Sequence, residues 1–387
     1  MAESTHGVPV MVYPYQMLKD AAFGAAPIIY GEHITEGQFQ PATMDLRLGN
    51  KMVAVPEAFT PPTHDSIEDY LKSVEHYPLY LNREQTQHLD RNKLYVVKLV
   101  ESCQFPETTR MIFSPKSSIG RNDVHVRVMC EKYPYYDRTP WGYKGPLYAL
   151  IASQSFHIGV RAGLEMVQGR IKTRTSKRLG TDEVYQMHQK YGIAYDKAGN
   201  ALVAREQIRV EDGTMNFHID LERDVVGFRA KRNVGTRLDL TAGETYQPEA
   251  YWEPMYRHGS RLVLDPGEFY LLATQERVKI PPECCGQLVP VDPDLGEFRV
   301  HYAGFFDNGF GGAQGTHGVL EVRASGVPFA LGHGKPVCGM QFERTFEVPT
   351  RLYGQGQSNY TEPLPSLSKH FDNRYSAWDL KYWASHR

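Results

Sequence analysis

The chain contains an internal repeat, and this repeat limits its fold more than any other feature of the 387 residues. Three segments of the first half each resemble a segment of the second half. Because the order and the spacing of these segments both match, we predict two copies of one structural unit. The aligned pairs are 41–55 with 216–230, 91–107 with 266–283, and 146–171 with 317–343.

The repeated unit is rich in β-strand signals. Short apolar runs such as KLYVVKLV, VHVRVM and EFYLLATQERVKI are separated by Gly and Pro, as in barrels and sandwiches. Helix signals are few, and the clearest spans 181–192, with Thr181 as the expected cap and Gly192 at its end. We therefore predict a mainly β protein with an N-terminal domain (1–172), a linker with a helix (173–214) and a C-terminal domain (215–387).

Composition limits the class of partner. The formal net charge is only −2, so no global field attracts a polyanion, and we expect no nucleic-acid partner. No apolar run reaches the roughly 18 residues that span a bilayer, and the first residues lack a secretory pattern. We expect a cytoplasmic protein without a membrane partner. Five cysteines without framework spacing predict reduced, mostly buried thiols.

The segment SPKSSIGR (114–121) carries the first chemical signal. It follows the strand-like run TRMIF and combines two hydroxyls, a glycine and an arginine. Hydroxyls and backbone N–H groups can donate to phosphate oxygens or hold a water, and arginine offers a planar fork of donors. Lys116 adds a further positive charge. A surface turn explains the serines alone equally well, and the segment has no acidic partner nearby.

The order of motifs along the chain resembles the dCTP deaminases. The motifs are DLRLGN, SPKSSIGR, AGFFDNGFGG, VLEV, RLYG, SNY and LSKHF, in that order. The resemblance covers most of the chain and implies the distorted β-barrel of the dUTPase superfamily, which binds deoxynucleoside triphosphates. Since the motifs are spread over both repeats, it implies two tandem dUTPase-like barrels, as in the longer, duplicated deaminases.

The resemblance also supplies the missing acid. The family's catalytic carboxylate matches Glu321 in GVLEV, whereas the first repeat has Leu150 at that position. Conversely, the second repeat has VPVDPDLGE where the first has the serines. Each half has lost what the other kept, which predicts that the two halves share one site. We expect both parts of the site to come from the same chain, and a site shared between two chains is the alternative. The resemblance then implies that Glu321 is the general base, that Ser117 positions the water or the amino group, and that Arg121 orients Glu321. A solvent-facing glutamate in an alternating strand is the alternative for Glu321 alone.

Further binding roles follow from the same resemblance. Lys116 and Ser118 would contact phosphates. Asp307, in AGFFDNGFGG, would accept a hydrogen bond from the deoxyribose 3′-hydroxyl, although Asp-Asn-Gly is also a good turn sequence. Backbone groups from His301 to Ala303 would contact the base edge.

The C-terminal segment 351–371 resembles the tail that closes over the triphosphate in this superfamily. Tyr353 and Tyr360 match its aromatic positions. The segment departs from the family around Glu362, whose charge is unfavourable beside phosphates, and Lys369 is the expected substitute cation. A mobile, proline-containing terminus is the alternative.

No protein-bound metal is expected. Zinc deaminases need His-x-Glu and Pro-Cys-x-x-Cys, but the only close cysteines here are adjacent, in PPECCGQ. The resemblance implies Mg²⁺ bound through the substrate triphosphate and no zinc.

The leading functional prediction is hydrolytic deamination of dCTP to dUTP and ammonia, which belongs to dUTP and dTTP metabolism. A dUTP diphosphatase, alone or combined with deamination, is one alternative. A non-catalytic deoxynucleotide-binding regulatory protein is another. Whether dCTP, dCMP or a modified cytosine nucleotide is preferred stays open, as does a homo-oligomeric state.

Overall fold

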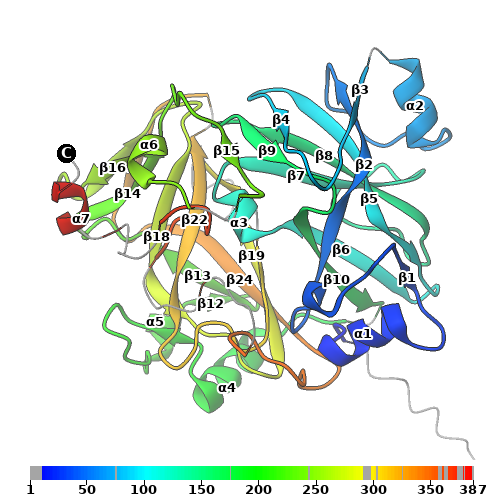
Figure 1. Ribbon diagram of the computed structural model, residues 1–387. Helices are drawn as coiled ribbons and strands as arrows, with labels where there is room; N and C mark the ends of the chain where they lie inside the picture. The colour runs from blue at the N-terminus through cyan, green and yellow to red at the C-terminus, as the bar shows by residue number, and fades with distance from the viewer. Residues whose placement is uncertain are drawn as a thin grey trace, which may run out of the picture.

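The computed structural model shows two β-rich halves lying side by side (Figure 1). The mainly β architecture predicted from the sequence is confirmed. No helix in the described part of the chain is long and apolar enough to cross a membrane. The structure describes residues 11–74, 76–174, 176–242, 245–290, 298–301, 304–324, 326–355, 360, 365–372, 378 and 380–385.

The N-terminal half is built around an eight-stranded sheet whose central order is β6-β10-β2-β5-β8-β7. Its elements are α1 (Tyr15–Phe23), β1 (Ile29–Tyr30), the 3₁₀ turn η1 (Glu36–Gln38), β2 (Met44–Val55), α2 (Ile67–Ser73), β3 (Tyr77–Tyr80), β4 (Gln87–Leu89), β5 (Leu94–Gln104), β6 (Thr109–Pro115), α3 (Ser117–Gly120), β7 (Val124–Cys130), β8 (Lys144–Ser153), β9 (Ile158–Val160) and β10 (Glu165–Thr173).

A connecting region leads to the second half. It contains α4 (Thr181–Tyr191), β11 (Ala194–Tyr195), α5 (Arg205–Ile208) and β12 (Val210–Glu211). The C-terminal half has β13 (Thr214–His218), β14 (Val225–Ala230), β15 (Leu238–Asp239), α6 (Pro248–Tyr251), β16 (Trp252–Tyr256), β17 (Arg261–Leu264), β18 (Tyr270–Val278), β19 (Cys284–Pro290), β20 (Phe298–His301), β21 (Phe305–Phe306), β22 (Thr316–Ala324), β23 (Phe329–Gly332), β24 (Pro336–Arg344) and α7 (Leu380–Ser385). The domain boundaries at 172 and 214 stay a prediction.

The strand pairing repeats between the halves. β10 pairs with β6 and β2, just as β24 pairs with β19 and β13. β5 pairs with β8, just as β18 pairs with β22. The long strand β2 corresponds to two shorter strands, β13 and β14, so the second half is divided between a six-stranded and a five-stranded sheet. The duplication seen in the sequence is therefore present in the topology.

Matching side-chain contacts give the register of the repeat. The Tyr95 hydroxyl accepts from the Asp90 N–H at 2.9 Å, and the Tyr270 hydroxyl accepts from the Asp265 N–H at 2.8 Å. The residue after each tyrosine pairs with the neighbouring strand: Val96 lies opposite Leu150, and Leu271 lies opposite Glu321. Leu150 and Glu321 thus occupy equivalent positions.

The two halves share apolar surface. Leu320 and Val322 lie in the core of the C-terminal half, whereas Val319 and Leu271 lie in a core that continues into the N-terminal half. Strand β15 also pairs in parallel with β9 of the N-terminal half. This packing holds the facing surfaces of the halves in a fixed relation, which a site between them requires.

Two local predictions can be compared with the structure. The helix predicted at 181–192 is α4, but Thr181 is not its cap: Gly180 is the N-cap residue, and its N–H donates to the Glu183 carboxylate at 3.0 Å. Thr181 instead accepts from the Gly213 N–H at 3.0 Å, so a tertiary contact displaced the local capping role. All five cysteines are buried and free, as predicted.

Candidate active site

The segment Ser117–Arg121 lies where the two halves meet. β6 ends at Pro115, α3 begins at Ser117, and the Ile119 side chain is buried beneath the turn. The Lys116 N–H donates to the Met166 carbonyl at 3.0 Å, which fixes the segment against β10. Figure 1 shows α3 beside β22 of the other half.

Glu321 comes from the middle of β22. Side chains alternate along a strand, so Leu320 and Val322 enter the core while Glu321 points to the opposite face. Only 6% of Glu321 is exposed. Burial raises the pKa of its carboxyl well above the usual range; the Arg121 guanidinium opposes this shift, and the Asp123 carboxylate adds to it.

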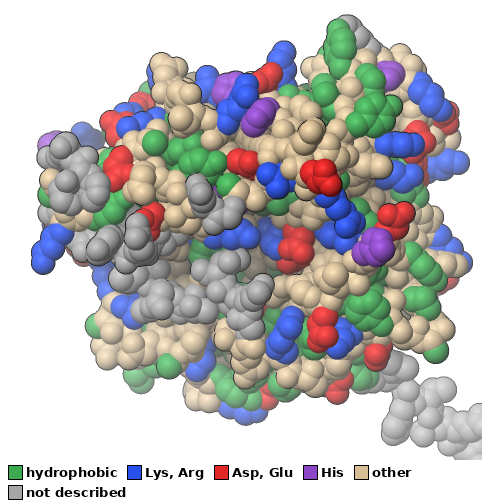
Figure 2. Space-filling model, in the orientation of Figure 1, with side chains coloured by type: hydrophobic (Ala, Val, Ile, Leu, Met, Phe, Trp, Pro, Cys, Tyr) green, Lys and Arg blue, Asp and Glu red, His purple; other side chains and the backbone are tan. Residues whose placement is uncertain are grey.

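One pocket collects these side chains from both halves of a single chain. Ser117, Arg121 and Glu321 all line it, although about two hundred positions separate the first two from the third. Basic and acidic side chains gather where the halves meet (Figure 2). The other lining residues are Gln40, Asp45, Lys116, Ser118 and Gln168 from the N-terminal half, and Leu288, Gly304, Phe305, Phe306, Asp307, Phe310, His317, Gly318, Val319, Tyr353 and Tyr360 from the C-terminal half.

The described contacts of Arg121 go to the C-terminal tail. Its Nη1 donates to the Ser366 carbonyl at 2.7 Å and to the Ser366 hydroxyl at 3.1 Å. Its guanidinium lies over the Tyr360 ring, 3.9 Å from the centroid. Ser366 and Tyr360 thus contact the pocket arginine, and closure of the tail over a triphosphate stays a prediction.

Lys116 is engaged by two carboxylates. Its Nζ lies 2.5 Å from Asp45 and 2.7 Å from Glu165. Burial raises the pKa of the Asp45 carboxyl to about 6; Lys116 opposes this shift and Glu165 adds to it. A phosphate contact by Lys116 stays a prediction, and it would require the substrate to share the ammonium with these acids.

Asp307 is positioned by residues of the other half. The Thr43 hydroxyl donates to Asp307 Oδ2 at 3.1 Å, and Arg170 Nη2 lies 4.0 Å from Oδ1. Arg170 is fully buried and stacks over the Phe305 ring at 4.3 Å. Oδ1 is buried and has no hydrogen-bond partner among the described residues. Burial raises the pKa of Asp307, and Arg170 opposes the shift.

The two tail tyrosines also line the pocket. Tyr353 packs edge-on against Phe310, and its hydroxyl accepts from the Tyr360 N–H at 3.3 Å. Lys369 does not line this pocket. Its N–H donates to the Tyr360 hydroxyl at 3.3 Å, and the residue lines a second cavity with Arg83. Its ammonium is nevertheless close enough to Lys116 and Asp45 for their charges to affect its pKa, which burial lowers.

Some predicted site residues cannot be placed in full. The backbone of His301 pairs with Glu321 across β20 and β22, so it borders the site, but its side chain lies outside the described residues. Ala303 and Glu362 lie outside them as well, as do residues 291–297 of the segment that replaces the serines.

Comparison with known proteins agrees with this geometry. Residues 10–175 match the N-terminal domain and residues 188–371 match the C-terminal domain of 2′-deoxycytidine 5′-triphosphate deaminase. A crystal structure of 2′-deoxycytidine 5′-triphosphate deaminase from Agrobacterium tumefaciens superposes with a TM-score of 0.81 at 34% identity, covering 90% of this chain and 99% of that one.

The chain belongs to the dCTP deaminase family. Two curated relatives are named "dCTP deaminase, dUMP-forming". The one from Methanobrevibacter smithii is 35% identical over 106 residues, 26% of this chain and 52% of the relative. The one from Mycolicibacterium gilvum is 32% identical over 123 residues, 30% of this chain and 63% of the relative. The chain therefore matches between half and two thirds of each. The two tandem dUTPase-like barrels that the resemblance implied agree with the likeness to the Agrobacterium deaminase.

Several pocket residues of this family member were not predicted from the sequence. Asp45 lies in the quoted DLRLGN motif, so the motif pointed to it without giving its role. Gln168 and His317 lie outside the motifs that carry the resemblance, so no sequence signal pointed to them. His317 is buried beside Arg223, and burial with this arginine lowers its pKa to about 3, so it is a neutral hydrogen-bonding group.

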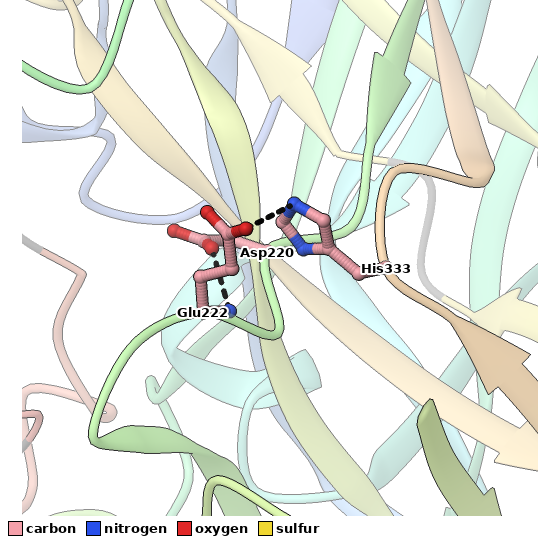
Figure 3. A group of neighbouring side chains, drawn as sticks. All are labelled: Asp220, Glu222 and His333. Atoms are coloured by element: carbon pink, nitrogen blue, oxygen red, sulfur yellow. Dashed lines mark hydrogen bonds and ion pairs between the residues drawn. The ribbon is translucent and has the colours of Figure 1, made fainter. Parts of the chain in front are cut away.

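A second polar cluster lies outside this pocket. Asp220, Glu222 and His333 approach one another closely enough to hold a cation (Figure 3). However, the Lys197 ammonium contacts Asp220 at 2.7 Å and Glu222 at 3.2 Å. His333 Nδ1 accepts from the Leu221 N–H at 3.0 Å. Lys197 and Arg223, which lies 2.8 Å from Asp220, together balance the two acids, so the cluster is explained as a salt-bridge network.

Proposed function

We propose that the protein deaminates dCTP hydrolytically to dUTP and ammonia. The observation that carries this proposal is that Ser117 and Arg121 from one barrel and Glu321 from the other line one pocket. Each barrel lacks the other's part, since Leu150 occupies the position of Glu321 in the first repeat. Family membership and the pocket therefore support the same chemistry.

In the proposed reaction, Glu321 takes a proton from a water whose oxygen bonds to C4 of cytosine. The proton passes to N3, which leaves a hydroxyl and the amino group on C4. The proton of that hydroxyl then passes through Glu321 to the exocyclic nitrogen, the C4–N bond breaks, ammonia leaves and the C4 carbonyl of uracil forms. Ser117 positions the water or the amino group. Arg121 stabilises the developing negative charge and limits the rise of the Glu321 pKa.

We assign recognition of the sugar to residues of the same pocket. Asp307, which lines the pocket, would accept a hydrogen bond from the 3′-hydroxyl. Phe305 and Phe306 line the pocket beside it and would crowd a ribose 2′-hydroxyl. Lys116, Ser118 and the tail residues Tyr353, Tyr360 and Lys369 would lie toward the triphosphate.

Magnesium would be carried by the triphosphate. Asp45 and Glu165 are oxygen ligands of the kind Mg²⁺ accepts, but Lys116 engages both, so the substrate oxygens are the better ligands. Bound Mg²⁺ would neutralise phosphate charge.

We expect deamination to survive a zinc-selective chelator and to fall when Mg²⁺ is removed. Steady-state ammonia release with each treatment measures this. Loss of activity with the zinc chelator, restored by added zinc, would refute the metal-free water activation.

The product distinguishes three functions. With dCTP as substrate, we expect one ammonia per dUTP formed and no pyrophosphate. Release of pyrophosphate with dUMP would instead indicate the combined reaction, which the names of the two curated relatives favour. Tight binding of dCTP without ammonia release would indicate a regulatory protein. Parallel assays with dCMP identify the nucleotide that is preferred.

The pH dependence should reflect the buried base. Burial raises the pKa of Glu321, so the ionised form gains population only as pH rises through this raised value. We expect kcat/KM to rise with pH along a limb that lies above the ordinary glutamate value of 4.5. A pH profile corrected for ionisation of the substrate measures it, and a limb at the ordinary value would contradict the assignment of Glu321.

A further inference from the structure

A buried ion pair joins the two halves next to the candidate active site. Arg323 donates from Nε to Asp123 Oδ1 at 3.2 Å and from Nη2 to Asp123 Oδ2. The Asp123 side chain has no exposed surface, and that of Arg323 is 14% exposed. The pair is therefore a two-point contact between the halves that is largely removed from solvent.

The pair has a fixed relation to the catalytic residues. Asp123 follows Arg121 by two positions, and Arg323 follows Glu321 by two positions. On β22, residues two apart lie on the same face, about 7 Å apart along the strand. Arg323 therefore projects from the same face as Glu321, and its partner belongs to the turn that carries Arg121.

Both ends of the pair are anchored further. The Ser155 hydroxyl donates to Asp123 Oδ2 at 2.6 Å, and Arg323 Nη1 donates to the Gly267 carbonyl at 2.6 Å. The Asp123 backbone has a left-handed φ of 58°, and its N–H donates to the Gly120 carbonyl at 2.8 Å. The backbone of Asp123 is thus fixed in a turn between α3 and β7, and its carboxylate points from this turn toward the other half.

Stability alone is a poor explanation for such a pair. Removing two charges from water costs as much as their attraction returns, so apolar residues would join the halves at least as well. Buried pairs are better explained where they define one relative placement of two surfaces. Here the placement that they define is that of Arg121 relative to Glu321.

We propose that Asp123 and Arg323 are positioning residues that align the arginine turn of one barrel with the glutamate strand of the other for catalysis. This inference rests on the proposed deamination. Neither Asp123 nor Arg323 is among the residues that line the pocket, so the pair acts through Arg121 and Glu321. The Asp123 carboxylate is close enough to Glu321 for its charge to add to the raised pKa of that residue.

The test is a double-mutant cycle with Asp123→Asn and Arg323→Gln. Asparagine tolerates the left-handed backbone, so this change removes charge while keeping the turn. We expect each single variant to lower kcat by roughly 10- to 100-fold, because small misplacements of reacting groups are costly. KM for dCTP should change by less than about 3-fold, and the double variant should lose no more than the worse single variant.

The matched control is Asp137→Asn. Asp137 also has a left-handed φ, 59°, and also pairs with an arginine, Arg127, but both belong to the N-terminal half and neither lines the pocket. This variant should retain the wild-type kcat. Arg323→Lys keeps the charge, disturbs folding least, and should recover part of the kcat lost in Arg323→Gln.

The outcomes separate the inference from the function on which it rests. A wild-type protein that releases no ammonia from dCTP refutes the proposed function. With an active wild type, the inference is overturned if Asp123→Asn keeps the wild-type kcat while its melting temperature falls as in Asp137→Asn. The inference is also overturned if the fold-losses in kcat of the two single variants multiply in the double variant, because the two residues would then act independently.

Discussion

Replacing Glu321 by glutamine is expected to reduce dCTP turnover by at least about 10³-fold, near the upper range for loss of a general base. The amide keeps the shape of the side chain in a site where only 6% of the residue is exposed, but it cannot take a proton from water. The affinity for dCTP should change little. Ammonia release and calorimetric titration with dCTP measure the two effects separately.

A matched control is Glu276→Gln. Glu276 lies on the neighbouring strand β18, and its carboxylate accepts from the His218 N–H at 2.9 Å outside the pocket. This variant should keep activity within a few-fold of the wild type, since it removes a structural charge only. If Glu321→Gln kept comparable turnover, Glu321 would not be the base. If it lost dCTP binding instead, the residue would be a ligand contact.

The sequence alone predicted that each repeat lacks the site residues kept by the other, because the two repeats preserve the same strand register. The pairs Val96–Leu150 and Leu271–Glu321 are equivalent in the structure, so aligning the repeats placed a leucine at the position of an acid. The mainly β fold could also be predicted from the sequence, since short apolar segments with strand-like alternation are separated by turn residues. The alignment of the repeats succeeded because equivalent residues occupy equivalent positions on paired strands in the two halves.

Side-chain contacts between distant segments could not be predicted from the sequence in the same way. Lys116 carries the expected charge, but its partners Asp45 and Glu165 come from two other strands of the barrel. Arg170 reaches Asp307 across the boundary between the halves. No local pattern specifies such pairs, because they depend on how the barrels pack.

The second large effect is expected from complementation between inactive chains. Two variants are needed: Ser117→Ala with Arg121→Ala, and Glu321→Gln. Each should be inactive alone. Because these residues line one pocket of a single chain, we expect mixed and co-refolded variants to remain inactive, since every chain lacks one part of its own site. Ammonia release from the refolded mixture measures this.

The alternative arrangement predicts a distinct yield. If chains exchanged barrels in a dimer, random pairing would make about half of the dimers mixed, and each mixed dimer would combine two intact parts in one of its two sites. Activity would then return to about a quarter of the wild-type level. Refolded wild type sets the scale, and separately refolded variants set the background. The shared apolar core and the β9–β15 pairing hold the two barrels of one chain together, which favours absence of recovery. Clear recovery would show that the site forms between chains, while the pairing of Ser117 and Arg121 with Glu321 would stand.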